Sequence, residues 1–162
     1  MRKIWLSLLI FLFLCGCTVQ KQTQPVTTGI SFAAEISYRG EKYLCDCEVA
    51  EKGDMTVCVR QPETLQGLKI CFVSGKASAE FLGLKYTPQN DRFPAGAMVS
   101  CLYGILQNER TAAIKKSNGA LHGRINGRPY TLKISPAGFP LEAEIPDENC
   151  RITFRQVTVL SR

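Results

Sequence analysis

The sequence predicts a mainly β (α+β) fold, in which a curled antiparallel half-barrel sheet of about nine to ten strands holds one inserted helix. Two observations predict it. Apolar and polar residues alternate through most of the chain from Ile30 onward, which is typical of antiparallel strands with one covered face and one wet face. Residues 94–107 change to a helical period. Because a single sheet of this size has to curl, we expect the helix to fill its concave side.

Alternation predicts five strands before the helix. Their ranges are 30–38, 43–49, 55–60, 68–73 and 77–87. Gly53 lies in the turn after the second strand and is free to take a positive φ. Pro62 and Gly67 interrupt the alternation after the third strand, and Gly83 predicts a bulge or bend within the fifth.

The helix is predicted by apolar residues at a helical spacing, namely Met98, Cys101, Leu102, Ile105 and Leu106. Pro94 suits the first turn of a helix. Beyond the helix, Asn126-Gly127 predicts a tight hairpin, because both positions tolerate a positive φ. The strands expected in this half are 112–116, 121–125, 130–134, 141–145 and 152–160.

The first seventeen residues describe an export signal with a lipid attachment site. A cationic start precedes Ile4–Leu14, an uncharged run that is shorter than the roughly 20 apolar residues needed to span a bilayer. Leu14-Cys15-Gly16-Cys17 resembles the bacterial lipobox. The resemblance implies lipidation of the Cys17 sulfur, cleavage after Gly16 and acylation, with palmitate for example, of the new amino terminus. An ordinary secreted protein with a coincidental Cys17 is the alternative.

These observations predict three segments: a signal peptide over 1–16, the lipidated Cys17 with a flexible tether over 17–29, and one domain over 30–162. The mature protein would be held by its lipid on the extracytoplasmic face of the cell membrane. Loss of Arg2 and Lys3 leaves 18 Lys and Arg against 14 Asp and Glu, a net charge of +4. So small a charge does not favour nucleic acid as a partner. We expect a monomer.

The order of elements resembles the LolA/LolB-like group of lipoprotein-carrier and lipid-binding domains. The resemblance covers most of 30–160 and is clearest in Pro62–Leu68 (PETLQGL) and in Tyr130–Ile145 (YTLKISPAGFPLEAEI), which Ile152-Thr153-Phe154 follows. It implies a half-barrel that binds or carries an acyl chain or other amphiphile at the cell envelope, with no enzyme activity and no cofactor. The alternative is a structural or interaction lipoprotein with a filled barrel and no ligand.

Two segments that combine expected mobility with apolar side chains, Gln89–Met98 and Pro136–Leu141, are candidates for a ligand entrance. They give three ligand-binding candidates, Phe93, Met98 and Phe139. Phe93 precedes a proline, and Phe139 lies between a glycine and a proline, in loops of the kind that carry binding residues on a rigid sheet. Packed against a closed core, the two phenylalanines would instead be structural anchors.

Six cysteines follow the lipobox: Cys45, Cys47, Cys58, Cys71, Cys101 and Cys150. Export permits disulfides, and six cysteines allow 15 connectivities. Cys58 and Cys71 are a possible pair, because they lie on neighbouring predicted strands. Cys45 and Cys47 share a strand face, but a structural zinc site would usually add a second close pair, so we expect no metal. His122 suits a surface strand, and we expect no catalytic residues.

Overall fold

The computed structural model describes residues 24–90, 92–94, 97–111, 115–117 and 120–160. The signal peptide and Cys17 lie outside these residues. The strands are β1 (Ile30–Tyr38), β2 (Glu41–Val49), β3 (Met55–Gln61), β4 (Lys69–Val73), β5 (Lys76–Phe81), β6 (Leu84–Tyr86), β7 (Lys115–Ser117), β8 (Ala120–Ile125), β9 (Arg128–Ile134), β10 (Pro140–Ile145) and β11 (Cys150–Val159). One α-helix, α2 (Met98–Thr111), and two short 3-10 turns, η1 (Glu63–Leu65) and η2 (Pro146–Glu148), complete the described elements.

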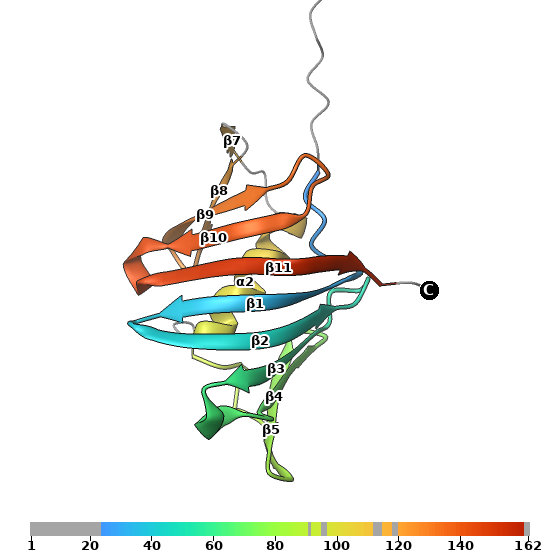
Figure 1. Cartoon of the computed structure of the whole chain (residues 1–162), viewed down its shortest axis with the longest axis vertical. Helices are drawn as coiled ribbons and strands as arrows, with labels where there is room; N and C mark the ends of the chain where they lie inside the picture. The colour runs from blue at the N-terminus through green and yellow to red at the C-terminus, as the bar shows by residue number, and fades with distance from the viewer. Residues whose placement is uncertain (1–23, 91, 95–96, 112–114, 118–119, 161–162) are drawn as a thin grey trace, which may run out of the picture.

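All eleven strands form one antiparallel sheet in the order β6-β5-β4-β3-β2-β1-β11-β10-β9-β8-β7 (Figure 1). The centre of the sheet pairs the first strand with the last, from Ile30 opposite Val159 to Tyr38 opposite Cys150. On either side of this pair the chain runs as a meander, β1 to β6 on one side and β11 back to β7 on the other. The predicted fold class, a mainly β antiparallel half-barrel with one helix, is confirmed.

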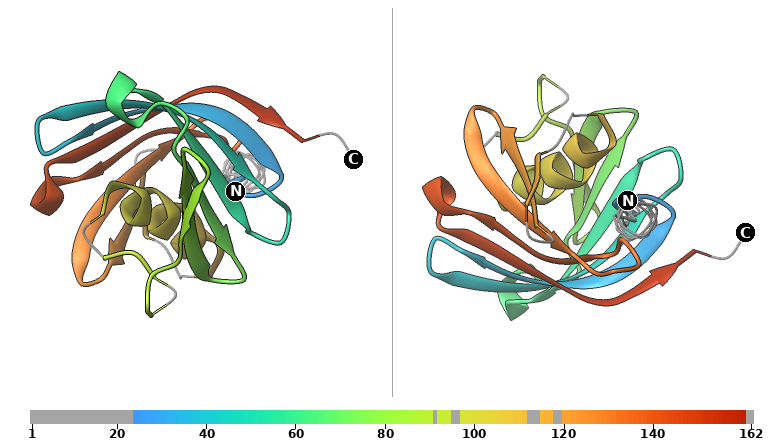
Figure 2. Two further views of the ribbon diagram at one scale, coloured as in Figure 1. Left: turned by 90° about the horizontal axis from the view of Figure 1, so that it is seen from below. Right: turned by 90° about the horizontal axis from the view of Figure 1, so that it is seen from above.

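The sheet curls around α2, which lies on its concave side (Figure 2). The helix buries one face there, formed by Val99, Cys101, Leu102, Ile105 and Leu106. Inward residues of the central strands meet it, because successive side chains of a strand point to opposite faces. Phe32 and Phe154, on neighbouring strands, pack with ring centroids 5.2 Å apart. Burial of this apolar surface is the main stabilising term of the fold.

The prediction of the fifth strand was wrong in part. We expected one strand over 77–87 with a bend at Gly83, but the segment forms a hairpin of β5 and β6. Leu82 and Gly83 both take positive φ, 51° and 78°, and together make its two-residue turn. Leucine is rarely found in this conformation, so Leu82-Gly83 indicated a bend at Gly83 but not a two-residue hairpin turn. The strand count rises accordingly to eleven.

The helix also differs at both ends from the predicted range. It begins at Met98 and ends at Thr111, about one turn later at each end than 94–107. Pro94 belongs instead to a turn before the helix, in which its carbonyl oxygen accepts a hydrogen bond from the amide of Ala97. The Asn126-Gly127 hairpin is confirmed, with φ values of 50° and 82°.

The described part of the predicted tether contacts the domain. The Val26 amide donates a hydrogen bond to the Gly138 carbonyl oxygen, and Thr27 is 4% exposed. The Leu160 amide donates to the Gly29 carbonyl oxygen, so the two ends of the domain lie together. Of the helices that the structure describes, none is both long and apolar enough to cross a bilayer.

Candidate binding site

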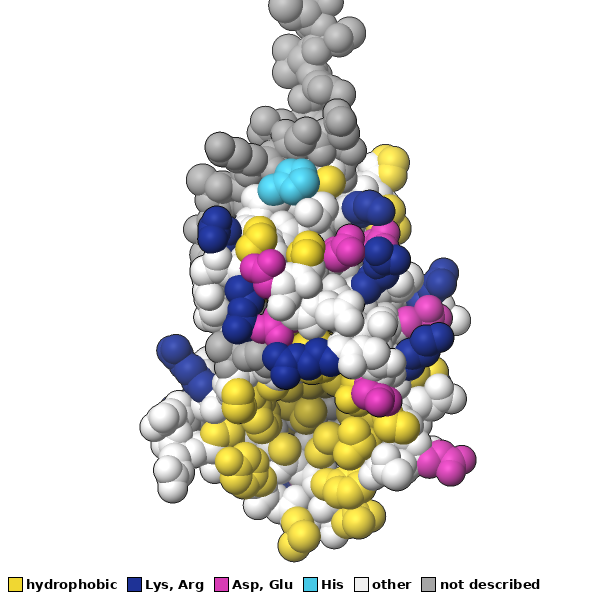
Figure 3. All heavy atoms as spheres, turned by 90° about the vertical axis from the view of Figure 1, so that its left-hand side faces the viewer, with side chains coloured by type: hydrophobic (Ala, Val, Ile, Leu, Met, Phe, Trp, Pro, Cys, Tyr) yellow, Lys and Arg dark blue, Asp and Glu magenta, His cyan; other side chains and the backbone are white. Residues whose placement is uncertain are grey.

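One end of the half-barrel carries a group of half-buried apolar side chains, which we call the apolar mouth. Its members are Tyr38, Tyr43, Leu65, Leu68, Ala79, Ala97 and Met98. Tyr38 and Tyr43 flank the β1–β2 connection, Leu65 and Leu68 belong to the β3–β4 connection, and Ala79 lies in the second half of β5. In an antiparallel meander these positions lie toward the same end of the sheet. Figure 3 shows hydrophobic side chains gathered around a hollow on the lower part of this face, below a region rich in charged side chains.

A second hollow, the aromatic cleft, lies between α2, the β4–β5 hairpin and the β8–β9 turn, with a volume of about 360 Å³. Three aromatic rings form its wall. Phe72 of β4 stacks on Tyr103 of α2, with ring centroids 4.2 Å apart and planes within 6°. Phe93, from the segment before the helix, meets Phe72 edge-on at 6.1 Å. The cleft is therefore a rigid apolar surface, since the rings hold each other in place.

The polar groups of the aromatic cleft lie around this wall. Ser100, Gln107, Asn126 and the exposed Arg92 line it. Gln107 is held in place, because its side-chain amide donates a hydrogen bond of 2.7 Å to the Gly53 carbonyl oxygen. A concave apolar wall with a few polar groups is the usual composition of a small-molecule site.

A glycine lets the helix approach the sheet edge beside the cleft. A Cβ atom on Gly104 would lie 2.9 Å from Cγ2 of Ile125, closer than such atoms normally come. With a larger residue at position 104, the Ile125 side chain would have to shift for α2 and β8 to pack at this distance. Glycine weakens a helix by roughly 1 kcal/mol relative to alanine, and this close packing accounts for a glycine at position 104.

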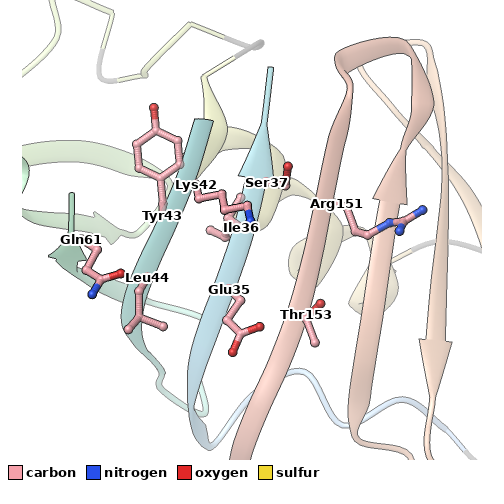
Figure 4. Close-up of a pocket in the computed structure, with 9 residues that line it drawn as sticks. All are labelled: Glu35, Ile36, Ser37, Lys42, Tyr43, Leu44, Gln61, Arg151 and Thr153. Atoms are coloured by element: carbon pink, nitrogen blue, oxygen red, sulfur yellow. The ribbon is translucent and has the colours of Figure 1, made fainter. Parts of the chain in front are cut away.

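The opposite face of the sheet holds a hollow of similar size, the convex pocket, with a volume of about 330 Å³ (Figure 4). The lining residues that alternate onto this face are Glu35, Ser37, Lys42, Leu44, Arg151 and Thr153, and Ile36, Tyr43 and Gln61 complete the lining. Figure 4 shows the Arg151 side chain turned toward β10, where Glu142 and Glu144 lie 3.4 and 3.2 Å from it. Arg155 pairs with Glu35 at 3.4 Å. The charges along this pocket thus largely neutralise one another.

The three predicted ligand residues do not converge. Phe93 lines the aromatic cleft, and Met98 lies in the apolar mouth at the start of α2. Phe139 is half-buried against the core in the β9–β10 loop, where its amide donates a hydrogen bond of 3.0 Å to Ser135 Oγ. Phe72 and Tyr103 were not predicted as partners of Phe93, because their contact joins segments far apart in the chain.

The cysteines are all free in the described structure. Cys58 lies opposite Lys69 and Cys71 lies opposite Thr56, so the predicted pair is diagonal on the sheet. Diagonal positions are about 7–8 Å apart, beyond the usual Cα separation of a disulfide. A Cys58–Cys71 bond would therefore need a local shift of the strands.

Cys45 and Cys47 share the concave face of β2, where burial raises the pKa of the Cys45 thiol to about 12. Among the residues that the structure describes, no cluster of three or more His, Cys, Asp and Glu side chains could hold a metal. His122 is exposed on β8, with its Nδ1 atom 3.2 Å from Thr131 Oγ1.

A buried carboxylate at the same end of the sheet as the apolar mouth was not predicted. The Glu148 side chain is 2% exposed and its Oε2 accepts a hydrogen bond of 2.7 Å from Arg39. Its Oε1 forms an ion pair with Arg128. The three residues join the β1–β2 turn, the start of β9 and η2. The sequence showed only a polar turn around Glu148, and nothing in it paired that turn with arginines about 20 and 109 positions away.

The chain was compared with known proteins. The solved structure of a LolA superfamily protein from Nitrosomonas europaea is similar to it, with a TM-score of 0.41 and 7% sequence identity over 82% of this chain and 86% of that chain. No protein-family model matches, and no curated protein is significantly similar. The function therefore has to follow from the residues of the site.

Proposed function

We propose that the protein is a membrane-anchored lipoprotein whose half-barrel binds an acyl chain or a similar amphiphile, without catalysing a reaction. The observation that carries the proposal is the apolar lining on the concave side of the sheet, at the apolar mouth (Figure 3) and in the aromatic cleft. Exposed apolar surface that is grouped around a hollow favours a ligand or partner that covers it.

The dimensions of the aromatic cleft suit part of an amphiphile. Its volume of about 360 Å³ lies at the lower end of the range for small-molecule sites, roughly 300–1,000 Å³. The rings of Phe72, Phe93 and Tyr103 offer apolar contact to a hydrocarbon chain. Arg92 at the same cleft offers a positive charge to a carboxylate or phosphate head group. An anionic single-chain amphiphile combines both properties.

A direct binding measurement tests this assignment. The chain from Thr18 onward would be titrated with a fluorescent fatty acid, and Phe93→Ser compared with Leu141→Ser. Phe93 lines the cleft, whereas Leu141 is 46% exposed on β10 and lines none of the hollows described above. Loss of one buried aromatic contact is worth roughly 1.5–3 kcal/mol, so Phe93→Ser should weaken binding by about 10- to 100-fold. Equal affinities for both variants would contradict the assignment.

The head-group part of the proposal has its own test. Arg92→Ala should weaken the binding of a fatty acid but leave that of the fatty alcohol of the same length nearly unchanged. An ion pair at an exposed position is worth no more than about 1 kcal/mol, so the expected loss is up to about fivefold. Equal losses for acid and alcohol would show that Arg92 acts through packing.

Membrane attachment is proposed from the lipobox. A single acyl chain holds a protein only marginally, whereas two or more chains anchor it stably. In a bacterial host, the wild-type protein should partition into the membrane fraction as a processed, lipidated form. Cys17→Ser should abolish lipidation and leave either an uncleaved precursor or a released protein. A Cys17→Ser protein that stays membrane-bound after processing would refute the lipobox assignment.

One observation favours the alternative, an interaction lipoprotein with a filled barrel. Leu102, Ile105 and Leu106 of α2 are fully buried and occupy the middle of the concave side. Native mass spectrometry of the mature domain separates the two functions. A lipid mass retained on the wild-type protein and lost in Phe93→Ser supports ligand binding, whereas a bare mass after exposure to lipid supports the filled barrel.

A further inference from the structure

We propose that Cys101 and Cys150 form an intramolecular disulfide that ties the first turns of α2 to the start of β11. The proposal is independent of the proposed ligand, because it rests on two cysteines outside the aromatic cleft. It concerns the contact between the helix and the sheet that closes the concave side (Figure 2).

The two cysteines face each other across that contact. Cys101 is the fourth residue of α2 and is 3% exposed on its buried face. Cys150 is the first residue of β11, is 2% exposed, and lies between Tyr38 of β1 and Ile145 of β10 in the sheet. The thiol of each cysteine is the neighbour that most strongly shifts the pKa of the other, so the two sulfur atoms lie close together. Sulfur atoms that lie close together can be brought to bonding distance by rotation of the side chains.

The remaining cysteines are placed less favourably for an intramolecular disulfide. Cys45 and Cys47 lie two residues apart on one strand, and Cys58 and Cys71 are diagonal on the convex face. By contrast, Cys101 and Cys150 belong to different layers and are 49 positions apart in the chain. A bond between them closes a long loop and joins two elements that otherwise touch only through side chains.

The pKa values of the two thiols depend on each other. The hydrogen bond from Cys150 lowers the pKa of Cys101, and Arg128 and Arg39 act in the same direction, against burial and the Glu148 carboxylate. The same hydrogen bond and burial raise the pKa of Cys150. A thiolate is the form that attacks a disulfide.

The reaction is a thiol–disulfide exchange with an external disulfide, such as oxidised glutathione or a protein oxidoreductase. The thiolate of one cysteine, Cys101 for example, attacks one oxidant sulfur, forms a mixed disulfide and releases the other sulfur as a thiolate. Cys150 then loses its proton and attacks the Cys101 sulfur, which releases the second half of the oxidant. Overall, two protein thiols are oxidised and one external disulfide is reduced to two thiols. Because both cysteines are buried in the folded domain, the exchange takes place before α2 is fully packed.

Peptide mapping tests the bond on the wild-type chain. The protein would be reduced in denaturant, refolded with reduced and oxidised glutathione, alkylated, and digested with trypsin without reduction. Trypsin places Cys101 in peptide 93–110, Cys150 in 134–151, Cys58 in 53–60 and Cys71 in 70–76. We expect peptide 93–110 linked to 134–151. Alkylated Cys101 and Cys150 in the refolded protein, or a link between 53–60 and 70–76 alone, would overturn the proposal.

Thermal unfolding gives a second readout. Closing a loop of this length should make the melting temperature of the oxidised protein about 8–16 °C higher than that of the reduced protein. Cys101→Ser and Cys150→Ser should each abolish this difference, whereas Cys58→Ser and Cys71→Ser should retain it. An unchanged redox difference in Cys101→Ser would assign the stabilisation to another pair and overturn the proposal, even if that variant is less stable.

Discussion

The convex pocket and the aromatic cleft have nearly the same volume, about 330 and 360 Å³, yet differ in what surrounds them. The convex pocket lies along ion pairs between neighbouring strands, such as Arg155 with Glu35. The aromatic cleft is walled by three rings with one exposed guanidinium, that of Arg92. A hollow of this size thus becomes a candidate site through the chemistry of its walls. The same comparison between the two sides of the sheet predicts unequal responses to mutation, oxidation and pH.

The largest expected difference is in tolerance of a new charge. Leu102→Asp places a carboxylate on the fully buried face of α2, among apolar side chains of the core. A buried unpaired charge costs at least about 4 kcal/mol, a large part of the roughly 5–15 kcal/mol that stabilises a domain. We expect a protein that is largely unfolded by circular dichroism. Ser37→Asp on the exposed convex side should change the free energy of unfolding by less than about 0.5 kcal/mol. Cooperative melting of Leu102→Asp near the wild-type temperature would contradict the helix packing.

Ion pairs should also differ in strength with their burial. Arg128→Ala removes a partner from the buried Glu148 carboxylate and should cost about 3 kcal/mol in urea unfolding. Arg155→Ala breaks the pair with Glu35, in which both side chains are more than half exposed, and should cost about 0–1 kcal/mol. If both variants lose the same free energy of unfolding, burial does not make the Arg128–Glu148 pair stronger than the Arg155–Glu35 pair.

Thiols on the two faces should react at different rates. Burial raises the pKa of the Cys45 thiol to about 12, against an ordinary value near 9, so its thiolate is about a thousandfold rarer at neutral pH. Cys58 and Cys71 are half-buried on the convex side. In the folded protein, iodoacetamide should therefore label peptides 53–60 and 70–76 at least about 100-fold faster than 43–52. Labelling of all three peptides at one rate would place Cys45 outside the core.

The smallest expected effect is on the stability of the folded protein at acid pH. The Lys133 hydrogen bond to Glu142 lowers the pKa of that carboxyl group on the convex face. Because the folded value is below the unfolded one, its stabilisation is present above the unfolded pKa, about 4.3, and is lost as the pH falls through the folded pKa. Glu142→Gln should reduce the loss of stability between pH 6 and pH 3 by less than about 1 kcal/mol. If Glu142→Gln lost more stability than the wild type between pH 6 and pH 3, folding would raise the pKa of Glu142 and not lower it.

The sheet was predictable because its signals are local. Alternation alone is enough to separate Ile36, on the concave face, from Glu35, on the convex face, and Asn126-Gly127 defines one hairpin. The β5–β6 hairpin was missed because its turn uses Leu82, a residue type that ordinarily avoids positive φ. Local patterns thus determine most strands but not an exceptional turn.

The candidate site was predictable only in part, since it is made by contacts between distant segments. Phe93 was identified from its loop, whereas its neighbours Phe72 and Tyr103 have the sequence pattern of ordinary core residues. Likewise, Cys101 fitted the apolar stripe of the helix, and only the curl of the sheet brings it to Cys150. Alternation carries no information on which end of the helix meets which strand.

The pairing of the first strand with the last at the centre of the sheet has a kinetic consequence. Ile30 and Val159 are 129 positions apart, so the middle of the sheet cannot assemble until synthesis of the chain is nearly finished. Contacts of such high sequence separation slow folding, because a long loop must close before they stabilise anything. The strands β1–β6 are therefore complete before β11 is synthesised, and the two halves of the sheet can join only at the end. A circular permutant that joins the neighbouring chain ends near Gly29 and Leu160 and opens the chain in the exposed β5–β6 turn would make the central pair local, and should fold faster.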